Sequence, residues 1–213
     1  MIFSNKYDFV TTKALIGHGI APAEGTKFSS VVCIANRIPI DSDPEDLIIC
    51  TGVLISPNHV LTAEHCIEDE STSFQVLVGS TDLRTATIYY PFWWLTFDWW
   101  ASAMGKQIEY NLNDIAITKL IQRVPDEVIP AILIYQPNSA YVGSNAVIAG
   151  WGTGNSGSSS NILQASTIRV ISNSNCEELV FRLQGSHSRV PEKYMCNIGQ
   201  PYVLSADVSI SGL

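Results

Sequence analysis

Apolar residues occur along this chain in short runs that turn-forming residues separate. Segments such as Pro39–Pro44 and Gly152–Ser160 are rich in Pro, Asp, Gly and Ser and predict loops. We interpret Gly152–Ser160 as a surface loop within a barrel and not as a linker between domains. Apolar residues at helical spacing are scarce, so the pattern predicts an all-β barrel or sandwich. Six runs rich in β-branched residues predict strands: Val31–Ala35, Leu47–Ile55, Phe74–Val78, Ile115–Leu120, Ala146–Ala149 and Thr167–Ile171.

The composition excludes several classes of function. The chain has 213 residues, of which 46% are apolar and 15% are charged, so a large core is expected and global disorder is not. Twelve Lys and Arg residues stand against 20 Asp and Glu residues, which gives a net charge of −8. A chain of this charge repels phosphate backbones, so we expect no nucleic-acid partner. No apolar run approaches the roughly 20 residues that span a membrane, so we expect no membrane insertion.

The cysteines predict disulfides and no metal site. None of the five forms a CxxC pair, and no Cys/His cluster has zinc-ligand spacing, so we expect neither a metal nor another cofactor. Two local pairs, Cys50 with Cys66 and Cys176 with Cys196, make a disulfide framework and leave Cys33 as a buried, inert thiol. Disulfides imply an extracellular protein, yet the first residues lack the apolar core of a secretory signal. We therefore expect the amino terminus as given to be incomplete or misassigned.

Four segments carry the candidate chemistry. In Cys50–Cys66 a strand, a Ser-Pro-Asn turn and a returning strand lead to Thr-Ala-Glu-His-Cys. Asn113–Leu120 reads Asn-Asp-Ile-Ala-Ile-Thr-Lys-Leu, Val147–Gly152 ends in Gly-Trp-Gly, and Ser166–Cys196 contains the second cysteine pair. Together they resemble the trypsin/chymotrypsin-like serine peptidases from about residue 15 to residue 196. Thr51 and Glu64 are departures, because the family has Gly and Ala at these positions.

This resemblance implies a fold and a mechanism. The expected fold is two six-stranded Greek-key β-barrels, with residues 15–125 in the first, residues 126–213 in a second barrel that is incomplete at the carboxyl end, and residues 1–14 as a propeptide-like extension. His65 is the expected general base. Asp114 accepts the ring N–H of the histidine, fixes its tautomer and stabilises the imidazolium. The expected partners are protein or peptide substrates, or another protein, bound by a secreted monomer.

The nucleophile is the weak point of the resemblance. The family's Gly-Asp-Ser-Gly-Gly-Pro motif is missing, and the residues after Cys196 offer Ser209 and Ser211 at rough spacing. We favour Ser211 because Gly212 follows it, although neither serine has the glycines of an oxyanion turn. We therefore expect a fragment, an aberrant gene product or a degenerate relative with little or no activity. A serine endopeptidase and a non-catalytic homologue that binds a protein both remain as hypotheses.

Two further segments bear on regulation and binding. Leu15–Gly25 resembles the start of the mature family enzymes, with Lys13 upstream and Ala14 between, so activation cleavage after either residue is open. The segment Pro91–Trp100 holds four of the five tryptophans. Its rings either divide between the core and a barrel edge, or they form an exposed patch that binds a partner.

Overall fold

The architecture is known from a computed structural model that describes residues 2–4, 7–11, 16–17, 19–37, 42–67, 73–108, 113–199 and 203–204. Within these residues there are two α-helices, α1 (Phe97–Ala103) and α2 (Asn173–Gln184), and β-strands dominate. The strands are β1 (Ile2–Ser4), β2 (Tyr7–Thr11), β3 (Ile16–Gly17), β4 (Ala21–Pro22), β5 (Val31–Asn36), β6 (Ile48–Ser56), β7 (His59–Thr62), β8 (Phe74–Val78), β9 (Thr87–Tyr89), β10 (Pro91–Thr96), β11 (Ala116–Leu120), β12 (Asn145–Gly150), β13 (Gln164–Ile171), β14 (Cys196–Gly199) and β15 (Val203–Leu204).

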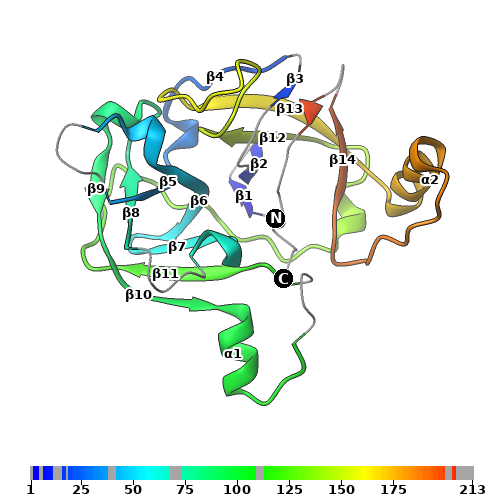
Figure 1. The fold of residues 1–213 in the computed structure, drawn as a ribbon, viewed down its shortest axis with the longest axis horizontal. Helices are drawn as coiled ribbons and strands as arrows, with labels where there is room; N and C mark the ends of the chain where they lie inside the picture. Colours follow the sequence, from blue (N-terminus) through cyan, green and yellow to red (C-terminus); the bar gives the residue numbers. More distant parts are fainter. Residues whose placement is uncertain are drawn as a thin grey trace.

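The first sheet is antiparallel and has the strand order β10-β11-β7-β6-β5-β8-β9 (Figure 1). Its two end strands are consecutive in the chain, and only Tyr90 separates them. The sheet therefore curls back on itself. A cluster of buried side chains fills its interior, including Val32, Leu54, Val60 and Leu120.

Strand β5 shows why some strands of this sheet contain an unbroken run of apolar residues in their sequence. Its residues from Val31 to Ala35 are all buried. Val32 and Ile34 point into the interior of the first sheet, whereas Val31, Cys33 and Ala35 join a second cluster with Trp151 and Leu163. Because successive side chains point to opposite faces, a strand buried on both faces needs an apolar residue at every position.

The second sheet has the order β1-β2-β12-β13-β14, and β4 also pairs with β13. Strand β2 runs parallel to β12, with Phe9 opposite Val147, while β13 is antiparallel to β12. A separate small sheet joins β3 to β15. Loop 152–160 connects two neighbouring strands of one sheet, so the prediction of a loop and not a domain linker is confirmed.

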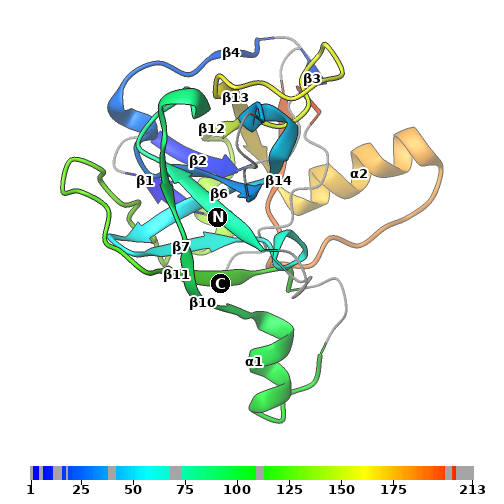
Figure 2. The ribbon, with the colours of Figure 1, turned by 60° about the vertical axis from the view of Figure 1, so that its left-hand side comes forward.

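The prediction of an all-β protein is confirmed. The six predicted strands are all present, with ends shifted by at most three residues. The sequence pattern did not predict either helix. Helix α2 contains no buried residue, and it begins where the Ser172 hydroxyl accepts a hydrogen bond from Asn175 N–H and ends at Gly185 with φ of +70°. Both helices project from the sheets (Figures 1 and 2).

No helix in the described part of the chain is both long enough and apolar enough to cross a membrane.

Candidate active site

His65 lies in a short 3-10 turn, Glu64–Cys66, which begins two residues after the end of β7. Asp114 lies two residues before β11, which is antiparallel to β7 with Ala116 opposite Thr62. Because the strands are antiparallel, the residues that follow β7 and those that precede β11 leave the sheet at the same end. The register of two neighbouring strands thus brings together two residues that are 49 positions apart.

Asp114 binds His65 with both carboxylate oxygens. The backbone N–H of His65 donates to Oδ1 at 2.9 Å, and the ring Nδ1 lies 2.6 Å from Oδ2. A carboxylate only accepts hydrogen bonds, so Nδ1 carries the proton and Nε2 of the neutral ring is left with a lone pair. The imidazole side chain is 37% exposed and the Asp114 side chain 14%. This arrangement fixes the orientation of the ring and leaves its Nε2 unprotonated.

The disulfide between Cys50 and Cys66 ties β6 to the turn that carries His65. Nε2 of His65 lies 3.6 Å from Sγ of Cys66 and 3.9 Å from Sγ of Cys50. These three side chains resemble a metal cluster by distance alone. Both sulfurs are bonded to each other, however, and thiolates are the form of cysteine that binds metals. The disulfide therefore restrains the backbone next to His65.

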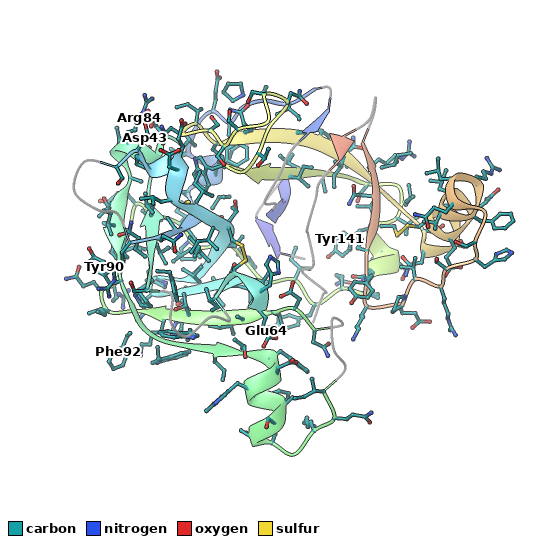
Figure 3. All side chains as sticks on the ribbon, viewed as in Figure 1. Asp43, Glu64, Arg84, Tyr90, Phe92 and Tyr141 are labelled. Carbon is teal, nitrogen blue, oxygen red and sulfur yellow. A yellow bond between two sulfur atoms is a disulfide. The ribbon has the colours of Figure 1, made fainter. Side chains whose placement is uncertain are left out.

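Glu64 makes a contact that the sequence did not predict. The residue is buried, and its Oε1 accepts a hydrogen bond from Asp98 N–H in the first turn of α1 at 3.4 Å (Figure 3). The Thr96 hydroxyl caps the same helix through Trp99 N–H. The departure from Ala at position 64 thus connects the turn of His65 to a helix that carries tryptophans.

Asn113 and Lys193 connect the aspartate region to the second half of the chain. Lys193 Nζ donates to Asn113 Oδ1 at 3.1 Å, next to Asp114. The pair is 80 residues apart, and nothing in the sequence marked it. A contact between two loops with no repeated spacing leaves no periodic signal.

The expected nucleophiles are not placed. Ser209 and Ser211 lie outside the described residues, as do Lys13, Ala14 and His18.

The aromatic segment 91–100 divides between core contacts and exposed rings. Trp94 packs edge-on against the buried Phe74, with ring centroids 5.5 Å apart. Phe92 is 67% exposed, Trp99 66%, and Trp93 and Trp94 are both 38% exposed. Figure 3 shows Phe92 and Tyr90 pointing away from the body of the protein. The segment therefore has rings that pack against the core, as one expectation held, and exposed rings, as the other held.

The remaining cysteines behave as the spacing predicted. Cys176 and Cys196 form the second disulfide, and Cys33 is free and fully buried. Burial raises the pKa of the Cys33 thiol far above its ordinary value, because the apolar surroundings disfavour the thiolate. Cys33 is thus a packing residue between the two sheets.

A polar contact between the two halves of the chain lies on the opposite side of the first sheet from α1 (Figure 3). Asn161 Nδ2 donates to Asp43 Oδ1 at 2.7 Å, and Glu45 N–H donates to the same oxygen at 3.3 Å. These hydrogen bonds, first that of Asn161, lower the pKa of Asp43 below its ordinary value. Asp82 and Arg84 form an ion pair nearby.

Comparison with known proteins places the chain among serine peptidases. Residues 29–203 match the Trypsin protein family. Trypsin alpha of Drosophila melanogaster is 30% identical over 155 residues, covering 69% of this chain and 56% of its own length. Venom serine protease 34 of Apis mellifera is 32% identical over 60% of this chain and 34% of its own length. Serine proteinase stubble of Drosophila melanogaster is 28% identical over 69% of this chain.

The chain spans less than two thirds of the length of each of these relatives, with shares of 56%, 34% and 19%. Among solved structures, neuropsin, a serine protease expressed in the limbic system of mouse brain, aligns with a TM-score of 0.60 at 20% identity. The alignment covers 89% of this chain and 74% of that structure, and it supports the same fold.

Proposed function

The chain belongs to the trypsin family of serine peptidases, and from this we propose a serine-endopeptidase-like protein that hydrolyses peptide bonds by a Ser/His/Asp mechanism. The observation that supports the proposal most strongly is the double contact between Asp114 and His65, at 2.6 Å to the ring and 2.9 Å to the backbone. The proposed nucleophile is Ser211, with Ser209 as the alternative.

The proposed chemistry uses Nε2 of His65 as a shuttle for one proton. The serine hydroxyl oxygen attacks the carbonyl carbon of the peptide bond while its proton moves to Nε2. Nε2 then gives this proton to the leaving amine as the C–N bond breaks. Water repeats the cycle on the acyl-enzyme, and Asp114 stabilises the imidazolium in both halves.

The proposed organisation follows the same family. Residues 15–213 form the peptidase domain, with residues 15–125 and 126–213 as its two halves, and residues 1–14 are propeptide-like. The substrates are proteins or peptides, and the protein acts outside the cell as a monomer. Two disulfides and a venom serine protease among the relatives support the extracellular location.

A fluorophosphonate probe tests the proposal because it bonds covalently to an activated serine. The proposed mechanism predicts labelling of the native protein, loss of labelling in His65→Ala, and unchanged labelling in the matched control His59→Ala. His59 is also a partly exposed histidine, but its Nδ1 lies 2.7 Å from Ser56 Oγ and its ring lies beside Trp93. Peptide mapping of the adduct separates Ser211 from Ser209. Equal labelling of the native protein and of His65→Ala would contradict the mechanism.

The exposed rings of the aromatic segment support a second candidate function, a non-catalytic homologue that binds a protein partner. Large apolar side chains at this exposure are common where a protein surface binds another. A folded native protein that the probe does not label at all would favour this function over the first.

A further inference from the structure

Asn155 binds both backbone groups of Gly17, a residue 138 positions away. Gly17 N–H donates to Asn155 Oδ1 at 2.8 Å, and Asn155 Nδ2 donates to the Gly17 carbonyl at 2.7 Å. One primary amide thus supplies the donor and acceptor that a neighbouring strand supplies in a sheet. Reversing the amide would place donor against donor and acceptor against acceptor, so the two partners fix its orientation.

The strand that contains Gly17 is held from its other edge as well. In β3 the peptide groups of successive residues point to opposite edges, and β3 pairs with β15 through Ile16 opposite Leu204 and Gly17 opposite Val203. The φ of Gly17 is +143°, a conformation that residues with a side chain rarely adopt. Asn155 and β15 therefore enclose a two-residue strand with a backbone specific to glycine.

The loop that presents Asn155 is itself braced. Gly154 N–H donates to the Ser158 carbonyl and Gly157 N–H to the Gly154 carbonyl, both at 3.0 Å. The loop is closed at its base by Ser160 N–H, which donates to the carbonyl of the buried Trp151 at 3.0 Å. Asn155 is thus held on a hydrogen-bonded turn above a core residue, and it has a fixed place from which to bind Gly17.

We propose that Asn155 is the positioning residue of the activation segment: its amide holds Gly17 on loop 152–160 and so sets where a new amino terminus lies after cleavage. The inference rests on the proposed function, because cleavage after Lys13 or Ala14 comes from the family resemblance. Cleavage after Ala14 leaves only Leu15 and Ile16 ahead of Gly17. A terminus this close to the anchor has little freedom to move.

Hydrogen exchange of the Gly17 amide, measured by NMR, tests the anchor. Asn155→Ala removes both hydrogen bonds, so we expect exchange at Gly17 to be about tenfold faster or more. Asn155→Asp keeps an acceptor for Gly17 N–H but sets an oxygen against the Gly17 carbonyl, and its exchange rate is expected between the two. The matched control Ser156→Ala loses a contact with Ser158 in the same loop and is expected to exchange as the native protein does.

Unchanged exchange in Asn155→Ala would overturn the proposal, and so would equal acceleration in Ser156→Ala, which would indicate general loosening of the loop. Protection of Val32 and Ile34 in β5 checks that every variant is folded. In a second experiment, added trypsin cuts the Lys13–Ala14 bond, and mass spectrometry measures the rate of this cleavage. We expect about tenfold faster cleavage in Asn155→Ala. Protection of Gly17 is expected to survive cleavage in the native protein and in Ser156→Ala, but not in Asn155→Ala.

Loss of Gly17 protection in the cleaved native protein would also overturn the proposal. None of these measurements depends on peptidase activity. A protein that fails to react with the fluorophosphonate probe can still show the anchor, and a reactive protein can lack it. Failure of this inference is therefore distinguishable from failure of the proposed function.

Discussion

Asp114→Asn is expected to reverse the tautomer of His65. In the native protein Oδ1 accepts the backbone N–H of His65 and Oδ2 faces Nδ1 of the ring. Asparagine has one oxygen and one NH₂ group. The backbone N–H requires the oxygen, so the NH₂ group faces Nδ1, which must then be unprotonated. The proton moves to Nε2, the nitrogen that a general base needs free.

The hydrogen bond between Asp114 and the ring sets how strongly one tautomer of His65 is favoured over the other. A hydrogen bond to a charged group contributes about 1.5–3 kcal/mol, and each 1.4 kcal/mol is a factor of ten. The native Nδ1–H tautomer is therefore favoured by about tenfold to a hundredfold. Because the imidazole is 37% exposed, water competes for the bond, and we expect the lower end of this range. In Asp114→Asn the preference is expected to reverse.

The assay is ¹⁵N NMR of the histidine ring nitrogens at a pH where the ring is neutral, and His65→Ala assigns the signal among the four histidines. The matched control is Asp98→Asn, which removes a carboxylate from α1, outside the His65–Asp114 contact. A protonated Nε2 in the native protein, or an unprotonated Nε2 in Asp114→Asn, would refute the reasoning. If the protein reacts with fluorophosphonate, the labelling rate of Asp114→Asn is expected to fall by about 10⁴.

Three other properties of the structure can be measured directly. Gly52→Ala places a Cβ 2.9 Å from Val60 Cγ1 and is expected to cost about 1–3 kcal/mol in urea unfolding; a loss below about 0.5 kcal/mol would contradict the packing. Cys33 is expected to resist maleimide until the protein unfolds, and prompt labelling of native protein would show that it is accessible. Because the folded-state pKa of Asp43 is lowered, its contribution to stability is present above about pH 4 and is lost as the pH falls through the lower folded-state value. Asn161→Ala is expected to flatten this acid-side loss in unfolding midpoints measured from pH 6 to pH 2.5, and an identical slope would exclude the contact.

The parts of the fold that the sequence predicted are those in which burial repeats with the period of a strand. Val31–Ala35 is apolar at every position because both faces of β5 are buried. The contact between His65 and Asp114 was expected from the motifs of the family resemblance, and the structure gives its physical reason. Asp114 precedes one strand and His65 follows another, and neighbouring antiparallel strands bring such residues together.

The parts that escaped prediction have other physical causes. Helix α2 has no buried residue, so no apolar period marks it, and only its ends at Ser172 and Gly185 carry local signals. The parallel pairing of Phe9 with Val147 joins distant segments without a turn between them. Glu64 binds a helix that follows it by more than thirty residues, and its sequence position indicated only a substitution.

The first sheet builds the part of the proposed site that holds His65 and Asp114. His65 and Asp114 are held by β7 and β11 of the first sheet and by the Cys50–Cys66 disulfide, which ties β6 to the turn of His65. The proposed serine belongs to the chain after β15. Strand β15 pairs with β3, and β3 contains Gly17, the residue that Asn155 holds. The geometry of the base can therefore persist in a protein whose serine is misplaced. For this reason the tautomer of His65 tests only the part of the site that the first sheet builds, and fluorophosphonate labelling tests that part together with the serine. A correct tautomer without labelling would separate a binding homologue from an enzyme, because it would locate the defect in the nucleophile alone.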